Sequence, residues 1–317
     1  MRIYTLAEIQ KIVTFSNAIE TVRNGFIAFA EGRIIQPEPM QMLFNDATNK
    51  LVGDCHVKAA QGIGLPNFVI KVASGFYNNT KAGLNANNGL VLVLSSETGY
   101  PIALLQDEGW LTQMRTAAAG ALAASLKPTN ANTVLGVMGT GTQALLQAKA
   151  ITHFLGLTKV MMYGRNQVAA QIVCDKLVRA GLKTQVAVSV EQLCHSSDII
   201  VTTTPATSPI LMACDVPERL HIIAVGADSP GKVEIDPELM SKADIIVTDN
   251  HAQCLHHGDF GAAVSRGLVG ETVDVSLCDL LAGKRTDVDF AAAKLSIVDL
   301  TGLGVQDLAI ANLVVQN

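Results

Sequence analysis

The sequence predicts an α/β protein in which a Rossmann-type doubly wound parallel sheet is joined to an N-terminal α+β domain. A glycine-rich turn at residues 139–144 lies in mid-chain, between a strand-like apolar run and a helix-like run. After this turn, short runs rich in valine and isoleucine alternate with helical stretches, a pattern typical of parallel sheets. The chain has 317 residues, a length that suggests two domains.

The composition narrows the functional classes. Hydrophobic residues make up 49% of the chain and charged residues 16%, which provides material for a large core. A net charge of −5 without a basic cluster argues against nucleic acid or an anionic membrane as the main partner. The N-terminus does not resemble a signal peptide, and no uncharged run approaches the roughly 20 residues that span a bilayer. The six cysteines form no C-x-x-C pair, so we expect free thiols in a reducing cytoplasm.

The segment before the glycine-rich turn is expected to form a mixed α+β domain that holds the substrate. Apolar residues at three-to-four spacing predict a helix from residue 6 to about residue 31. Strands are expected at residues 55–58, 68–72, 89–94 and 102–106. An alanine-rich helix at about residues 112–126 is expected to be the hinge between the domains.

The segment after the turn is expected to form the Rossmann domain, over residues 119–301. Further strands are predicted at residues 132–135, 159–163, 184–188, 199–203, 222–225 and 245–248. Helices are predicted at residues 145–154 and 167–180, the second closed by Gly181. The tail, residues 302–317, is expected to be a helix that packs back on the N-terminal domain.

The glycine-rich turn predicts a dinucleotide site. Gly139, Gly141 and Ala144 fit the pattern G-x-G-x-x-G/A, which seats a pyrophosphate on a helix N-terminus. The second strand ends 24 residues after Gly139, as one βαβ unit requires. The expected cofactor-binding residues of the turn are Gly139, Thr140, Gly141, Thr142 and Gln143.

The end of the second strand bears on the choice of cofactor. NAD-binding proteins usually place an acid there for the ribose 2′-hydroxyl, whereas this chain has Arg165 and Asn166. Arg165 would pair with a 2′-phosphate and Asn166 would support it, so NADP(H) is favoured and NAD(H) remains an option. The alternative is that Arg165 is an exposed loop residue. Thr203, at the end of a later strand, is a further candidate for cofactor binding, or else part of a cluster of strand formers.

Several motifs occur in one order along the chain. They are Lys71 with Asn79, then residues 115–118, 139–144 and 226–232, followed by residues 301–307. With them the chain, from about residue 53 to residue 308, resembles the ornithine cyclodeaminase/μ-crystallin family, and most of all its Δ1-pyrroline-2-carboxylate (ketimine) reductases. The resemblance implies a homodimer with a substrate-binding and dimerisation domain at residues 1–118.

Cationic side chains are the candidates for holding a substrate carboxylate. Arg115 offers two parallel hydrogen bonds, and Lys71 shares a strand face with Val69, so we expect a buried, paired lysine. The resemblance assigns Lys71 and Asp228 as catalytic residues, with Arg115, Lys71 and Asn79 as substrate-binding residues. Lys58 is a further candidate for substrate binding because it departs from the family pattern. It adds Thr116 and Thr301 to the cofactor site. The alternative for Asp228 is a residue that shapes a turn.

Two departures from the family pattern bear on the substrate. Lys58 stands where cyclodeaminases carry a glutamate for the distal amino group, and residues 39–41 lack the arginine of a Pro-x-Arg motif. Both departures disfavour ornithine. They favour a cyclic imino acid, or a substrate whose second carboxylate binds Lys58. The alternative for Lys58 is a solvated strand lysine.

A dense group of possible metal ligands occurs at residues 251–259, with His251, Cys254, His256, His257 and Asp259. No distant ligands with zinc-site spacing accompany it, so no metal is expected.

The expected function is that of a cytoplasmic NAD(P)H-dependent oxidoreductase acting on CH–NH or C=N bonds. The favoured reaction is reduction of Δ1-pyrroline-2-carboxylate to L-proline, with Δ1-piperideine-2-carboxylate to L-pipecolate as a related one. The alternatives are an iminosuccinate reductase or alanine-type dehydrogenase, an NAD-dependent ornithine cyclodeaminase, and a non-catalytic NADPH-binding protein. The expected partners are a small imino acid or amino acid and a second copy of the chain, with neither nucleic acid nor membrane.

Overall fold

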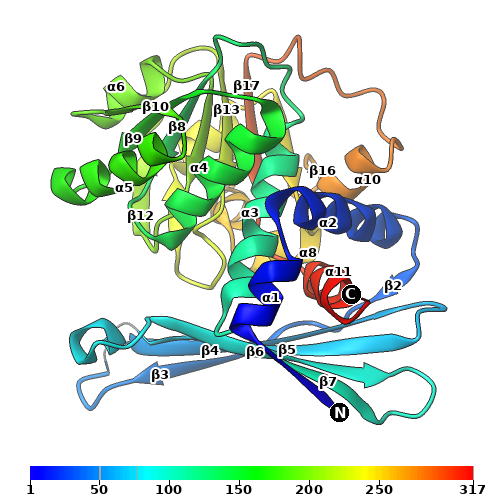
Figure 1. Cartoon of the computed structure of the whole chain (residues 1–317). Helices are drawn as coiled ribbons and strands as arrows, with labels where there is room; N and C mark the ends of the chain where they lie inside the picture. Colours follow the sequence, from blue (N-terminus) through cyan, green and yellow to red (C-terminus); the bar gives the residue numbers. More distant parts are fainter. Residues whose placement is uncertain (50, 77, 317) are drawn as a thin grey trace. The chain divides into compact units, whose positions relative to one another are not determined.

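The computed structural model describes residues 1–49, 51–76 and 78–316. The chain divides into two compact units, shown in Figure 1. Unit 1 comprises Met1–Arg115 together with Leu303–Asn317, and unit 2 comprises Thr116–Gly302. The division falls inside helix α3 (Trp110–Ala124), between Arg115 and Thr116.

Unit 1 is built on a seven-stranded sheet, counted over the described residues. The strand order is β1-β7-β6-β5-β4-β2, and β3 pairs with β4. Neighbouring strands are antiparallel except for β1 and β7. The strands are β1 (Arg2–Thr5), β2 (Ile34–Ile35), β3 (Met40–Asn45), β4 (Leu51–Gly62), β5 (Asn67–Phe76), β6 (Asn87–Ser95) and β7 (Pro101–Gln106).

Helices cover one face of this sheet. They are α1 (Leu6–Ile12), α2 (Phe15–Ala30) and α11 (Gly304–Val315), and a short 3-10 helix, Asn79–Ala82, precedes β6. Helix α11 packs against α2, β4 and β5, so the expected C-terminal helix belongs to unit 1. Asn317, the last residue of the predicted helix, lies outside the described residues.

The single helix predicted from residue 6 to residue 31 is wrong, because the chain forms two helices there. Thr14 has an extended backbone, and its hydroxyl accepts a hydrogen bond from the Asn17 amide at 3.3 Å. The Asn17 side chain in turn accepts from the Thr14 amide at 2.7 Å. This reciprocal capping starts α2 anew, although the apolar spacing runs on through the break.

Unit 2 contains an eight-stranded parallel sheet in the order β10-β9-β8-β11-β13-β17-β15-β16, again over the described residues. The predicted doubly wound parallel sheet is therefore confirmed. Its strands are β8 (Val134–Met138), β9 (Lys159–Tyr163), β10 (Lys183–Val186), β11 (Ile199–Thr202), β13 (Leu220–Ala224), β15 (Ile245–Thr248), β16 (Val275–Ser276) and β17 (Leu295–Asp299).

The remaining elements of unit 2 surround this sheet. A separate pair is formed by β12 (Thr207–Leu211) and β14 (Val233–Ile235). The helices are α4 (Thr142–Leu155), α5 (Gln167–Arg179), α6 (Val190–His195), α7 (Pro237–Ser241), α8 (His251–His256), α9 (Asp259–Ser265) and α10 (Leu277–Leu281). The order of strands reverses between β8 and β11, and open α/β sheets bind ligands beyond such a switch point. Among the helices of the described residues, none is both long and apolar enough to cross a membrane.

Candidate active site

Three buried charged side chains meet inside unit 1. The Lys71 Nζ lies 3.2 Å from Asp307 Oδ2, and the Arg115 Nε lies 3.3 Å from Asp307 Oδ1. The side chains are almost fully buried: Lys71 is 3% exposed, Arg115 is 8% exposed and Asp307 is 2% exposed. They come from β5, α3 and α11, so segments far apart in sequence build this group.

The sheet register explains why Lys71 points inward and adds a second lysine. Side chains two residues apart share a face of a strand, and Lys71 lies on the face of buried Val69, against α11. Lys58 is directly opposite Lys71 in the antiparallel pair of β4 and β5, so both lysines lie on this face. Lys58 is also buried, and is not a solvated strand lysine.

The electrostatics of the group follow from burial and neighbouring charge. Burial lowers the pKa of Lys71, the Arg115 charge lowers it further, and the Asp307 charge opposes both. Burial raises the pKa of Asp307, but the charges of Lys71, Arg115 and Lys58 outweigh it, so this pKa lies below its usual value. Three buried cations therefore face Asp307, and buried Asp107 is a second acid close enough to act on Lys71 and Asp307. The cations still outnumber the acids, and this suits an anionic ligand such as a carboxylate.

The sequence analysis included Asp307 and its neighbour Gln306 in the motif at residues 301–307 but gave neither residue a role in the site. Gln306 Oε1 accepts hydrogen bonds from Arg115 Nη1 at 3.0 Å and from the Leu303 amide at 2.8 Å, and so orients the guanidinium. A usable signal was present, because Asp307 is the one charged residue in the apolar sequence of α11. A lone buried acid in an apolar helix is rarely without a partner.

Asn79 is placed in the short 3-10 helix. Its side-chain amide donates to the Asn85 carbonyl oxygen at 3.1 Å and so shapes its own loop. The hydrogen bonds and ion pairs found among the described residues do not join it to Lys71 or Arg115.

The glycine-rich turn lies at the switch point between β8 and β11. Gly139 has a φ of +132°, and a Cβ there would collide with the Thr203 hydroxyl. A Cβ on Gly164 would collide with Thr140. Ala144, in the first turn of α4, is fully buried, as the third position of the pattern requires for close packing of helix and strand.

The glycine-rich turn has an open backbone at a helix N-terminus, as a dinucleotide site requires. A Cβ on Gly141 would meet nothing within 4 Å, so the backbone there is open to a ligand. Gly141 is the N-cap of α4, a helix of 14 residues, and no side chain of the described residues caps it. The positive end of the helix dipole at an open backbone suits a pyrophosphate.

Most other predicted cofactor residues have structural partners in unit 2. Arg165 is exposed, whereas Asn166 caps α5 by accepting from the Ala169 amide at 3.1 Å. The Thr203 hydroxyl donates to the Met138 carbonyl oxygen at 3.1 Å, and the Thr301 hydroxyl donates to Asp249 at 2.9 Å. The Thr116 carbonyl oxygen and the Gln143 side chain both accept from Gln147, at 3.0 and 3.4 Å, and Thr142 is the first residue of α4.

Asp228 follows the carboxyl end of β13 and is exposed. Its Oδ1 lies 2.7 Å from Lys232 Nζ and accepts from the Ser229 hydroxyl at 3.2 Å. Lys58, Lys71 and Arg115 are thus brought together in unit 1, while Asp228 and the predicted cofactor residues belong to unit 2. The described residues contain no group of three or more His, Cys, Asp or Glu side chains suited to a metal ion.

Buried acids lie near the carboxyl edge of the parallel sheet in unit 2. Asp259 accepts from the backbone amides of Glu234 and Ile235, at 2.7 and 2.8 Å. Burial, with repulsion from Glu234, raises the pKa of Asp259 to about 7. In the same region Asp299 accepts from the Phe260 amide at 2.9 Å, and burial with repulsion from Asp259 raises its pKa as well.

The raised pKa of Asp259 predicts a pH dependence of stability. The folded protein holds this proton up to about pH 7, whereas the unfolded chain releases it near pH 3.8, the ordinary pKa of an aspartate. The stabilising contribution is complete below pH 3.8 and is lost as the pH rises to about 7. We expect the free energy of unfolding, relative to an Asp259→Asn variant, to fall by up to about 3 kcal/mol between about pH 5 and pH 8.5. Urea unfolding at pH 5, 7 and 8.5 measures the difference; a constant difference would contradict the prediction.

The parallel sheet with its switch-point turn, and the buried cations of unit 1, define an α/β enzyme that uses a dinucleotide. The profile of the ornithine cyclodeaminase/mu-crystallin family matches residues 2–317. The chain belongs to this family, as its motifs predicted.

Two relatives illustrate the range of activities. An uncharacterised cyclodeaminase of Sinorhizobium fredii is 35% identical over 322 residues, covering 100% of this chain and 95% of the relative. A Δ1-pyrroline-2-carboxylate reductase of Bacillus cereus is 27% identical over 319 residues, covering 98% of this chain and 94% of the relative.

Two solved structures share the fold over its whole length. An archaeal alanine dehydrogenase dimer with bound NAD has a TM-score of 0.89 at 29% identity, covering 100% of this chain and 95% of the other. The iminosuccinate reductase of Paracoccus denitrificans in complex with NAD⁺ has a TM-score of 0.86 at 28% identity, with the same coverage. The protein is an NAD(P)H-dependent oxidoreductase, as the sequence predicted.

Proposed function

We propose that the protein reduces cyclic α-imino acids with NAD(P)H, converting Δ1-pyrroline-2-carboxylate to L-proline and Δ1-piperideine-2-carboxylate to L-pipecolate. The observation that carries the proposal is the buried group of Lys71 and Arg115 around Asp307, a receptor for one substrate carboxylate. The relationship to a Δ1-pyrroline-2-carboxylate reductase supports the choice of substrate. With this substrate the protein would act in proline metabolism.

The side chains of the chain have distinct roles in this reaction. Arg115 would hold the substrate carboxylate through its planar fork, and Lys71 would add a second charge-assisted hydrogen bond. Burial lowers the pKa of Lys71, which makes its ammonium group a stronger proton donor than an exposed lysine. The backbone of the glycine-rich turn would hold NAD(P)H, which would supply the hydride for reduction of the C=N bond. We assign Asp228 as the acid–base residue that keeps the imine nitrogen protonated and stabilises its positive charge.

Lys58 favours a second candidate, reduction of iminosuccinate. It is buried on the same sheet face as Lys71 and directly opposite it, and an additional cation suits a second carboxylate. The likeness to the iminosuccinate reductase structure supports this candidate. The same lysine would repel the distal ammonium of ornithine, so it argues against cyclodeamination.

A substrate panel tests the proposed function. Oxidation of NADPH and NADH would be followed with pyrroline-2-carboxylate, piperideine-2-carboxylate, iminosuccinate, and pyruvate with ammonia. We expect the largest kcat/KM with a cyclic imino acid, whereas a preference for iminosuccinate would select the second candidate. No oxidation with any compound would refute the reductase proposal, and release of ammonia from ornithine without net cofactor change would identify a cyclodeaminase.

Arg165 supports a preference for NADPH over NADH. It is exposed beyond β9, where a 2′-phosphate would be recognised, and no acid follows the strand. The Arg165→Asp variant is expected to shift the ratio of kcat/KM values from NADPH towards NADH by about tenfold or more, because it exchanges attraction for repulsion. Steady-state kinetics with both cofactors measure the ratio, with the exposed Arg179→Asp as a control. An unchanged ratio would remove Arg165 from cofactor selection.

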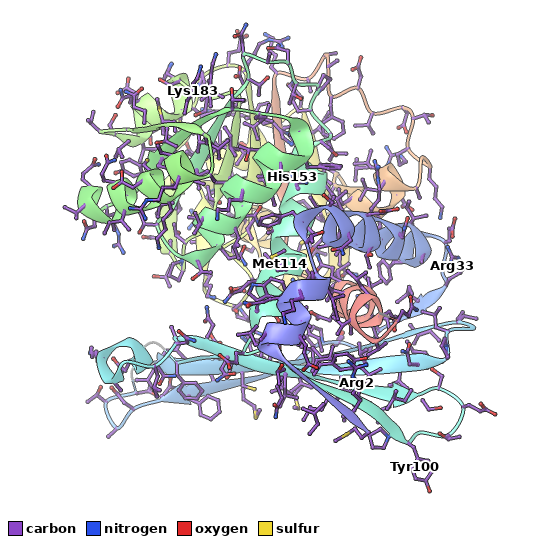
Figure 2. The ribbon with its side chains drawn as sticks, viewed as in Figure 1. Arg2, Arg33, Tyr100, Met114, His153 and Lys183 are labelled. Atoms are coloured by element: carbon purple, nitrogen blue, oxygen red, sulfur yellow. The ribbon has the colours of Figure 1, made fainter. Side chains whose placement is uncertain are left out.

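The sheet of unit 1 supports assembly as a homodimer. An antiparallel sheet with one face in water carries polar residues on that face. Here the face opposite α11 is apolar and exposed or half-buried, with Met42, Ile70, Leu90, Leu92 and Ile102. Figure 2 also shows Tyr100, which is 75% exposed, extending from the turn between β6 and β7. A second copy of the same face would bury this surface, and one structural relative is a dimer.

A charge placed on this face tests the dimer. Ile70 lies on a central strand, so Ile70→Lys is expected to raise the dimer dissociation constant by a hundredfold or more, about 3 kcal/mol. Analytical ultracentrifugation measures it, and Val168→Lys, on an exposed position of unit 2, is the control. A dimer of unchanged affinity in Ile70→Lys would place the interface elsewhere. All six cysteines are free thiols, which fits the proposed cytoplasmic location.

A further inference from the structure

Glu234 lies in β14 and is fully buried, yet the mechanism above gives it no role. Its carboxylate accepts three hydrogen bonds. Oε2 accepts from the Thr202 hydroxyl and from the Gly226 amide, both at 2.7 Å, and Oε1 accepts from the Thr204 amide at 2.6 Å. The ion pairs found among the described residues do not include Glu234. Burying a carboxylate that has hydrogen-bond donors but no counterion costs free energy of folding, which suggests that Glu234 has a function.

The three donors lie at the carboxyl ends of two neighbouring strands. Thr202 is the last residue of β11, and Thr204 follows it by two residues. Gly226 follows the end of β13 by two residues and precedes Asp228 by two. Strands β11 and β13 pair directly, so one carboxylate fastens both loops to each other and to β14.

The local geometry fits a carboxylate at this point. A Cβ on Gly226 would collide with the Thr204 carbonyl oxygen and lie 2.6 Å from the Glu234 carboxyl carbon, so glycine allows the close approach. Both carboxylate oxygens face backbone N–H donors, and a glutamine would turn its NH₂ group towards one of them.

The backbone of Glu234 is itself fixed by a second acid. Asp259, the first residue of α9, accepts from the Glu234 and Ile235 amides. The next residue, Phe260, donates its amide to Asp299 at the end of β17. Successive buried carboxylates thus connect β17, α9 and β14 to the two loops, all within unit 2.

We propose that Glu234 is a positioning residue that holds the Asp228 turn and the Thr203 loop in one fixed arrangement. Thr203 precedes Thr204, one of the donors, and packs against Gly139 of the glycine-rich turn. Glu234 therefore fixes the loop beside the glycine-rich turn and the turn that carries Asp228 at the same time. Glu234 acts through its neighbours and does not touch the reacting atoms. The catalytic part of this proposal rests on the proposed role of Asp228.

Hydrogen exchange tests the positioning without any assay of activity. In Glu234→Gln, the amides in residues 203–206 and 225–232 are expected to exchange at least about tenfold faster, while β9 stays unchanged. Glu238→Gln, at an exposed position of α7, is the control. If Glu234→Gln does not fold, Thr202→Val removes one of the three donors and serves for the same measurement. Unchanged exchange in both loops would overturn the proposal.

Kinetics test whether Glu234 acts through Asp228. Glu234→Gln is expected to lower kcat by about a hundredfold with less than about a threefold change in KM, because positioning is lost and carboxylate binding is not. In an Asp228→Asn background the further loss from Glu234→Gln should be less than about threefold. Full additivity would indicate a general structural role and overturn the catalytic part. If the wild-type protein reduces no imino acid, the proposed function is refuted. The positioning role of Glu234 is then tested by hydrogen exchange alone.

Discussion

Exchange of Lys71 for methionine is expected to lower kcat/KM for the imino acid by about a thousandfold, or about 4 kcal/mol. Methionine keeps the length of the side chain but removes the buried charge 3.2 Å from Asp307. Asp307 would then be balanced by Arg115 and Lys58 alone, and the substrate carboxylate would lose a charge-assisted hydrogen bond.

Steady-state kinetics of Lys71→Met with the preferred substrate measure this loss. Lys81→Met, at an exposed position of the short 3-10 helix, controls for the loss of one positive charge from unit 1. Because the carboxylate is held both before and during reduction, KM should rise along with the fall in kcat. A variant that retains more than a tenth of the wild-type kcat/KM would remove Lys71 from the site.

Replacement of Asp307 by asparagine is expected to have the largest effect on stability. The change leaves Lys71 and Arg115, both buried, without their shared anion, and breaking such a group costs about 3–5 kcal/mol in free energy of unfolding. A substrate carboxylate supplies a replacement charge. L-Proline is therefore expected to stabilise Asp307→Asn more than it stabilises the wild type.

Urea unfolding at pH 7.5, with and without L-proline, measures both parts of this prediction. Asp175→Asn, an exposed position on α5, gives the effect of removing an unrelated acid. A loss below about 1 kcal/mol would show that the cations are satisfied without Asp307. Equal stabilisation of both proteins by L-proline would show that the carboxylate does not bind at this group.

The parallel sheet was predicted well where short apolar runs are bounded by turn residues. The bounds predicted for β9 and β15, residues 159–163 and 245–248, are those observed. Strand β17 was not predicted, although it lies between β13 and β15 and is buried throughout. Its five residues include Ser296 and Asp299, and its partners are remote in sequence, so local periodicity carries little signal. The break before α2 was missed for a related reason, since a two-residue capping exchange overrides apolar spacing.

The candidate site was predictable only where residues carry their own pattern. The alternation of its strand predicted that Lys71 is buried. The spacing of the glycine-rich turn predicted that Gly139 binds the cofactor. Asp307 and Glu234 have meaning only through partners that the fold brings to them, as when Asp307 meets Lys71 from another element. Single-sequence patterns identify a charged residue at such positions but do not identify its counterion.

The division of the chain has a consequence for how the protein is made. Unit 1 is interrupted by the whole of unit 2, and α11, which carries Asp307, follows that interruption. During synthesis Lys71 and Arg115 therefore emerge from the ribosome long before the acid that neutralises them. Unit 2 is continuous in sequence, and we expect it to fold before unit 1, in which Lys58, Lys71 and Arg115 still lack Asp307. Refolding intermediates should accordingly contain an ordered unit 2 and an open unit 1, and the docking of α11 is the step that completes the molecule.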